Sequence, residues 1–157
     1  VLLAGDQILK YWVVTHLAVG ESAPFLPGFM QLTRLHNYGA AWSSLSGRTV
    51  LLVVFTAVLL AAVALLLIKK VVRHWTGITA CTLILSGGIG NIIDRIVHGY
   101  VVDMFDLQLF SYPVFNLADC CVVVGAILGG IYYLFLYEKY DKKKKEPDHA
   151  HDPSDPS

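Results

Sequence analysis

An uncharged apolar run at residues 50–68, VLLVVFTAVLLAAVALLLI, constrains this chain more than any other feature. A helix needs about 20 apolar residues to cross the roughly 30 Å hydrocarbon layer of a bilayer. A run of this length is typical of a membrane-spanning helix. Hydrophobic residues make up 55% of the chain, above the roughly 45–50% that is usual in soluble domains. The chain is therefore expected to be a membrane protein.

Further apolar stretches predict an all-α integral membrane protein with four transmembrane helices. We expect the spans at about 1–14, 50–68, 75–95 and 114–137. Only VLLAG precedes the charged Asp6, so we expect the first helix to be truncated at its N-terminus; the alternative is a segment that lies at the membrane interface. Residues 1–138 then form one membrane domain. Residues 139–157, basic at first and then rich in Pro and Asp, form a disordered tail.

The basic residues predict the orientation of the spans. They cluster between the second and third spans and after the fourth, at Lys69, Lys70, Arg73, Lys139 and Lys142 to Lys145. Because positively charged loops stay in the cytoplasm, both chain termini are expected there. The loops at 15–48 and 96–113 then face outward, and turn and apolar residues in the first predict that it lies at the membrane surface. The chain has no net charge at pH 7, so it shows no preference for nucleic acid.

Polar residues at membrane depth are the second informative feature. Each ionisable side chain there costs roughly 2.5–3.5 kcal/mol on insertion scales, so such residues usually mark a functional site. They lie at the outward ends of the predicted spans, at Asp6, Lys10, Asn91, Asp94, Arg95, Asn116 and Asp119. Spacings of three or four residues place them on shared helix faces. With Asp103 in the outward connection, they all collect on one side of the membrane.

Asp103 and Asp119 approach from opposite ends of one short connection. Two carboxyl groups in a partly apolar site cannot both ionise easily, so they are expected to share a proton. One carboxylate then activates a water while the other polarises a carbonyl, which is the chemistry of aspartic peptide hydrolysis. The alternative is that both are helix caps or ion-pair partners of Arg95 or Lys10, because no rule of spacing brings the two carboxylates together.

Other chemically interesting residues receive structural interpretations. We interpret Asp94 as a structural ion-pair or hydrogen-bond partner, and Asp106 as a solvated residue or a turn former. The cysteines all fall in apolar runs and are expected to be small buried residues: Cys81, Cys120 and Cys121. The sequence contains neither CxxC nor HExxH, and the histidines are scattered, so we predict neither a metal nor another cofactor.

The ordered motifs carry a family resemblance. The matching stretches are DQILK at 6–10, NYGAAWS at 37–43, SGGIGNIIDR at 86–95, GYVVDMFD at 99–106 and FNLAD at 115–119. In this order they resemble the prokaryotic lipoprotein signal peptidase family (signal peptidase II), which are four-span membrane aspartic peptidases. Ser86 stands where the family usually has glycine, a change that still allows close helix approach.

The resemblance implies roles for particular residues. It assigns the catalytic pair to Asp103 and Asp119. It also implies that further residues line or brace the site or bind substrate: Asp6, Lys10, Asn37, Gly87, Asn91, Arg95 and Asn116. Arg95 is expected to hold a carbonyl or a loop in place rather than to contact substrate. For Gly87, close helix packing is the physical interpretation.

The resemblance also implies a substrate and a location. The substrate is a diacylglyceryl-modified prolipoprotein, cut on the amino side of its lipidated lipobox cysteine. The enzyme is expected to be a monomer in the bacterial cytoplasmic (inner) membrane, embedded in the lipid bilayer, with its active site on the extracytoplasmic side. The alternative is a small ion- or proton-coupled membrane transporter, although transporters usually carry their polar groups near the midplane and show repeat symmetry. A non-catalytic membrane scaffold is a third possibility, which the number of carboxylates on one side disfavours.

Overall fold

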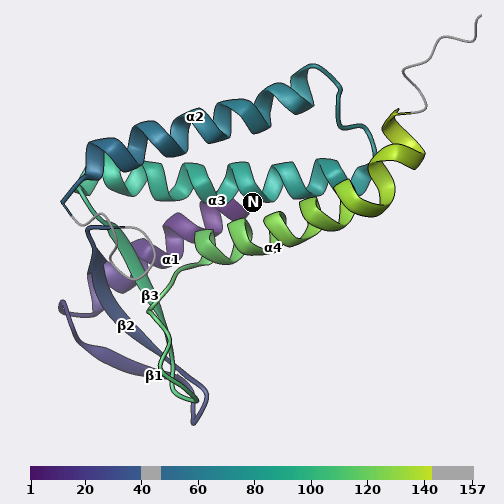
Figure 1. Ribbon diagram of the computed structural model, residues 1–157. Coiled ribbons are helices and arrows are strands. Elements are labelled where there is room, and N and C mark those ends of the chain that lie inside the picture. Colours follow the sequence, from purple (N-terminus) through teal and green to yellow (C-terminus); the bar gives the residue numbers. More distant parts are fainter. Residues whose placement is uncertain (40–46, 143–157) are drawn as a thin grey trace, which may run out of the picture.

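Long helices lie side by side, with a small sheet at one end of the bundle and a π-helical segment at the other (Figure 1). The computed structural model describes residues 1–39 and 47–142. In chain order the elements are α1 (Leu2–His16), β1 (Ser22–Leu26), β2 (Met30–Asn37), α2 (Thr49–Ile68), α3 (Trp75–His98), β3 (Val101–Leu107), α4 (Leu117–Ile131) and the π-helix η2 (Tyr132–Lys142).

Three helical segments are long and apolar enough to cross a membrane, judged by length and composition over the described residues. They are Thr49–Ile68, Trp75–His98 and Leu117–Lys142, the last combining α4 and η2. In α2 only Leu52 and Leu60 are buried, so most of its apolar surface is available to lipid. Helix α1, with 15 residues, is not among the three. The mostly helical membrane class therefore holds, while the count of four spans stays a prediction.

The prediction of an all-α protein was wrong in one respect, because the two outward connections contain strands. β1, β2 and β3 form an antiparallel sheet in that order, with Leu35 opposite Asp103 and Asn37 opposite Val101. Val101 to Met104 are all buried, because α1 packs against β3 through Val13. Burial on both faces gives β3 no polar–apolar alternation, so its sequence does not show the usual pattern of a half-exposed strand.

Small residues bring the helices into close contact. A Cβ on Gly87 of α3 would overlap the Ala118 carbonyl oxygen of α4, and a Cβ on Gly125 of α4 would lie 2.9 Å from the Ala80 carbonyl oxygen. Glycine at such positions is typical of helix pairs in membranes, where association depends on backbone approach. The contact at Gly87 matters for function because it fixes α3 against the first turn of α4.

The C-terminal end of the bundle continues further than expected. η2 remains helical through Lys142, so residues 139–142 do not belong to a disordered tail. The rest of that predicted tail, 143–157, lies outside the described residues, as does 40–46, which includes most of the NYGAAWS motif.

Candidate active site

The site lies where β3, the end of α3 and the start of α4 meet. Asp103 is on β3 and is 1% exposed, while Asp119 is in the first turn of α4. α4 begins at the N-cap Asn116, whose side-chain oxygen accepts a hydrogen bond from the Asp119 backbone N–H at 2.9 Å. In return the Asp119 carboxylate accepts from the Asn116 backbone N–H at 3.2 Å. This reciprocal cap satisfies two backbone donors and fixes the Asp119 side chain.

Asn116 also contacts the other carboxylate. Its side-chain Nδ2 donates to Asp103 Oδ1 at 2.7 Å, and the Asn116 side chain is fully buried. One residue therefore holds both aspartates, through its side chain on Asp103 and through its backbone N–H on Asp119. The local reason is the FNLAD sequence, which puts an asparagine at the N-cap and an aspartate three residues later.

The remaining carboxylate oxygens have amide donors as well. Asn37 of β2 donates to Asp103 Oδ2 at 2.9 Å, and Asn91 of α3 donates to Asp119 Oδ1 at 2.8 Å. Each of the four carboxylate oxygens thus accepts a hydrogen bond from an uncharged N–H group. Such donors orient a carboxylate without neutralising its charge.

The electrostatics of Asp103 follow from this environment. Burial of its carboxyl group, reinforced by the negative charge of Asp119, raises the pKa of Asp103 to about 7. The hydrogen bonds from Asn37 and Asn116 act in the opposite direction but do not cancel the effect. Asp103 therefore holds a proton near neutral pH far more readily than an ordinary aspartate.

Both carboxylates reach a cavity of about 390 Å³. Its walls come from five elements (β2, α2, α3, β3 and α4) and from the segment before α4. They include Asn37, Thr56, Arg95, Tyr112, Phe115 and Val122. The walls combine apolar side chains with a few convergent polar groups, as is usual for a substrate pocket. Thr56 and Phe115 were not predicted for the site. Thr56 is the lone polar residue in the 50–68 run, which is a signal that could have found it.

Arg95 of α3 lines the cavity and also holds a neighbouring segment. Its guanidinium donates to the Gly39 carbonyl oxygen at 2.8 Å and to the Asn91 carbonyl oxygen at 3.4 Å. The expectation that Arg95 holds a carbonyl in place is met by the bond to Gly39, which follows the end of β2. Asn37 is braced from the same segment, because its Oδ1 accepts from the Gly39 N–H at 2.9 Å.

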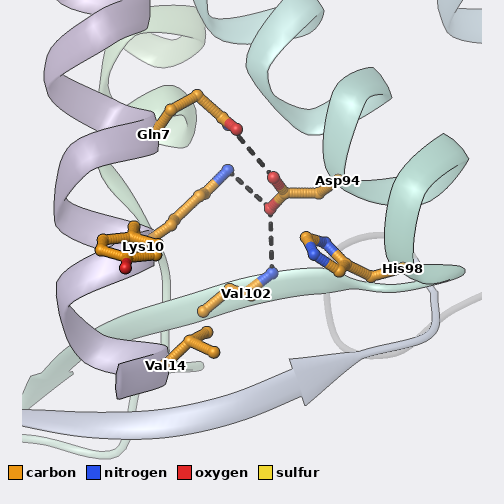
Figure 2. A pocket seen from close by; sticks show the side chains of 7 residues that line it. Gln7, Lys10, Val14, Asp94, His98 and Val102 are labelled. Carbon is orange, nitrogen blue, oxygen red and sulfur yellow. Dashed lines mark hydrogen bonds and ion pairs between the residues drawn. The ribbon is translucent and has the colours of Figure 1, made fainter. Parts of the chain in front are cut away.

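A second buried polar group lies beside the site, between α1 and α3. Lys10 donates to Asp6 at 2.8 Å, as their spacing of four residues predicted, and to Asp94 at 2.9 Å. Figure 2 shows Asp94 also accepting from the Gln7 amide, at 3.1 Å, and from the Val102 backbone N–H, at 3.1 Å. Asp94 is therefore an ion-pair and hydrogen-bond partner, as we interpreted it, and its structural rather than catalytic role stays a prediction. Gln7 was missed as an individual residue, although it lies within the DQILK motif.

Hydrogen bonds connect the Lys10, Asp6 and Asp94 cluster to the site around Asp103 and Asp119. Lys10 also donates to Asn91 Oδ1 at 3.1 Å, so it fixes the orientation in which Asn91 faces Asp119. Asp6 Oδ1 accepts from the Ala118 N–H at 2.9 Å, which ties α1 to the first turn of α4. Asp94 positions Val102, the residue before Asp103. The group formed by Lys10, Asp6 and Asp94 therefore contacts the residues that position Asp103 and Asp119, the pair that we call the dyad.

Gly87 is the last of the predicted site residues, and Asp106 is a nearby carboxylate that we did not assign to the site. Gly87 lies at the α3–α4 contact and makes room for the Ala118 carbonyl. We expected Asp106 to be a solvated residue or a turn former, and this was wrong. It is a half-buried residue of β3 that accepts hydrogen bonds from Gln31 at 2.7 Å and from Thr33 at 3.2 Å. It therefore belongs to the sheet rather than to the dyad. The catalytic and bracing roles of the assembled residues stay predictions.

Membrane-length helices around a buried cluster of carboxylates define a membrane protein with a polar site at one end of its bundle. The sequence profile of the family described as "Signal peptidase (SPase) II" matches residues 1–135. The "Lipoprotein signal peptidase" of Enterococcus faecalis is 43% identical over 145 residues, which cover 92% of this chain and 89% of the relative. That of Lactococcus lactis subsp. lactis is 38% identical and covers 91% of each chain.

A solved structure described as a bacterial membrane enzyme, obtained by the in meso method, matches with a TM-score of 0.80 and 34% identity. The match covers 93% of this chain and 89% of that one. The chain belongs to the signal peptidase II family. Membership makes it a membrane protease, and it disfavours the transporter and the scaffold as alternatives.

Proposed function

We propose that this protein is an aspartic endopeptidase that removes the signal peptide from diacylglyceryl-modified prolipoproteins. It cuts on the amino side of the lipidated lipobox cysteine. The name "Lipoprotein signal peptidase" of the similar proteins supports the substrate class. The observation that carries the catalytic assignment is the contact of Asn116 with both Asp103 and Asp119.

The proposed reaction uses one proton shared by the two aspartates. The ionised carboxylate takes a proton from a water, and the resulting hydroxide attacks the scissile carbonyl carbon. The protonated carboxyl gives its proton to the carbonyl oxygen, so a gem-diol forms. The gem-diol then collapses: the C–N bond breaks, the first carboxyl protonates the leaving nitrogen, and the second regains its proton from a diol hydroxyl. The raised pKa of Asp103 favours a shared proton near neutral pH.

The proposed location places the dyad at the extracytoplasmic face of the cytoplasmic membrane, in a monomer with both termini in the cytoplasm. The exposed Lys69 and Lys70 support this orientation, because they directly follow α2, whose C-terminal end lies away from the sheet (Figure 1). There the dyad is close to water while the acyl chains of the substrate stay in the bilayer. The proposed reaction needs no metal ion, because the carboxylates activate the water.

The β1–β2 hairpin is proposed to rest on the outer membrane surface and to cradle the substrate. Phe25, Leu26 and Phe29 at its tip are all exposed, which suits contact with the interfacial region of a bilayer. Gly28 has a φ of 75°, a left-handed conformation that permits the tight turn between the strands. Hydrogen exchange that shows the hairpin rigidly protected without substrate would count against a mobile cradle.

The test is cleavage of a synthetic diacylglyceryl-modified lipobox peptide by the purified protein in detergent or nanodiscs. The product should end at the residue before the lipidated cysteine, as read by mass spectrometry. The same peptide without its diacylglycerol should be cut poorly. Asp103→Asn and Asp119→Asn should lose cleavage, while Asp106→Asn, a carboxylate on the same strand as Asp103, should keep it. Turnover by either dyad variant would refute the mechanism.

A further inference from the structure

A second cavity, of about 490 Å³, lies at the end of the bundle opposite the sheet, among α2, α3, α4 and η2. Most of its walls are apolar, with Val63 and Leu66 from α2 and Ala80 and Ile84 from α3. Its volume is in the range of about 300–1,000 Å³ that is common for ligand pockets. It shares no lining residue with the cavity of the dyad, so it is a separate site.

Two glycines and a π-helical segment form part of the wall of this cavity. Gly77 and Gly129 line it from facing helices, and a Cβ on Gly129 would find its nearest neighbour 3.8 Å away, at the Ala80 Cβ. Beyond Gly129 the chain becomes π-helical at Tyr132, which also lines the cavity. π-helical turns are rare and occur frequently at functional sites.

The cavity opens toward the hydrocarbon layer. Leu66 and Tyr133 line it and are 41% and 67% exposed, so its rim lies on the outer surface of membrane-length helices. Along α3 the lining runs from Gly77 to Ile84, which corresponds to about 10 Å of helix axis. An apolar cavity that opens beside the lipid tails is filled most readily by an acyl chain.

Basic residues of the α2–α3 connection lie next to one end of the cavity. Val71 and Val72 line it, and they directly follow Lys69 and Lys70, which are exposed and have no ion-pair partner among the described residues. The acidic groups nearby are already engaged. Glu138 pairs with Lys142 at 2.6 Å, and Asp141 accepts from the Arg73 and His74 backbone N–H groups, at 3.0 and 3.1 Å.

We propose that this cavity binds one acyl chain of an anionic phospholipid, with the lipid phosphate held by Lys69, Lys70 and Arg73. Basic pockets between transmembrane helices are suited to anionic headgroups, and the apolar groove accounts for the chain. The tyrosines at this end mark the depth at which a headgroup lies. This site is independent of the dyad and does not rest on the proposed function.

The test compares two lipids with identical acyl chains, phosphatidylglycerol and phosphatidylcholine, on the purified protein by native mass spectrometry. We expect phosphatidylglycerol to be retained about 25-fold more, since two basic residues contribute roughly fivefold each at the membrane surface. Glycerol phosphate, which has no acyl chain, should not displace the lipid. Equal retention of the two lipids, or displacement by glycerol phosphate, would overturn the proposal.

Two adjacent glycines provide a matched pair of variants. Gly129→Leu should fill the cavity and abolish lipid retention. Gly130→Leu should leave retention unchanged, because Gly130 is exposed and a Cβ added to it would meet nothing within 4 Å. Retention by Gly129→Leu would overturn the proposal. Thermal melting of both variants shows whether each is folded.

A charge pair tests the headgroup contact independently of packing. Lys69→Gln should weaken phosphatidylglycerol retention about fivefold and leave phosphatidylcholine unaffected. Arg48→Gln removes an exposed cation from the opposite end of α2 and should change neither lipid. Equal behaviour of these two variants would contradict the headgroup site even if the cavity proves to hold an acyl chain.

Discussion

Two groups of carboxylates lie side by side in this protein, all buried except the half-buried Asp119, and they are stabilised differently. Asp6 and Asp94 share the Lys10 ammonium, with N···O distances of 2.8 and 2.9 Å. Asp103 and Asp119 receive only amide N–H groups, and among the described residues neither lies within ion-pair distance of a cation. Burial alone therefore does not distinguish them, because Asp94 and Asp103 are each 1% exposed.

This difference in hydrogen-bond partners indicates how one protein can use some carboxylates for structural support and others for proton transfer. A cation at hydrogen-bond distance compensates the charge of a buried carboxylate, and this suits Asp6 and Asp94 to a structural role. Amide donors fix the position of a carboxylate and leave its charge uncompensated, so the group can hold a proton near neutral pH. Asn91 joins the two groups, since it accepts from Lys10 and donates to Asp119.

The largest effect is expected from the amide-bonded pair. Asp103→Asn and Asp119→Asn should each lower the rate of lipopeptide cleavage by at least about 10³-fold, because each removes one of two coupled proton-transfer groups. Both variants should remain folded and inserted, with melting temperatures no lower than that of the unmodified protein. A folded variant with substantial cleavage would show that the chemistry belongs to a different group of residues.

Removal of the shared cation should affect stability most. Lys10→Met leaves Asp6 and Asp94 buried without compensation, and the free energy of unfolding should fall by about 3–5 kcal/mol. Thermal or denaturant unfolding in detergent measures this loss. Lys142→Met removes a lysine from an exposed ion pair with Glu138 and should change the free energy of unfolding little. Similar losses in the two variants would contradict a structural role for Lys10.

Asp94→Asn removes one carboxylate from the lysine-paired group and should have a smaller effect. Lys10 keeps Asp6 as a partner, so the loss of stability should be about 1.5–3 kcal/mol, as for a charge-assisted hydrogen bond. Cleavage by the folded variant should stay within a few-fold of normal. Complete loss of cleavage in a well-folded Asp94→Asn protein would mean that the two carboxylate groups do not divide the roles as proposed.

The smallest effect is the dependence on pH. Because the pKa of Asp103 is raised to about 7, cleavage should decline as pH rises above this value, approaching tenfold per pH unit as the shared proton is lost. The stability of the folded protein should also fall as pH rises. A raised pKa contributes stability that is complete below the unfolded-state value of about 3.9 and is lost as pH rises through about 7.

The control for this pH dependence is Asp103→Asn, which cannot ionise at that position. Its melting temperature should change less between pH 5 and pH 8 than that of the unmodified protein. Parallel melting curves for the two proteins over this range would contradict the raised pKa of Asp103.

Local spacing predicted part of this architecture well. The ion pair of Asp6 with Lys10 follows from a separation of four residues on a helix, and it is present at 2.8 Å. The apolar run at 50–68 corresponds to α2, at Thr49–Ile68. The sheet was missed because β3 is buried on both faces by other elements, so no alternation of polar and apolar residues reveals it. Asp106 was misplaced for the same reason.

The sequence by itself determined the membrane class, the helices of spanning length and the collection of polar residues toward one end, because hydrophobic length and helical period are local properties of the chain. Only the tertiary structure decided which carboxylates meet. Asp103 comes from a strand and Asp119 from a helix, and their partners Asn37 and Asn91 come from two further elements. Such contacts depend on strand register and on the close helix approach at Gly87, which no spacing along the chain encodes.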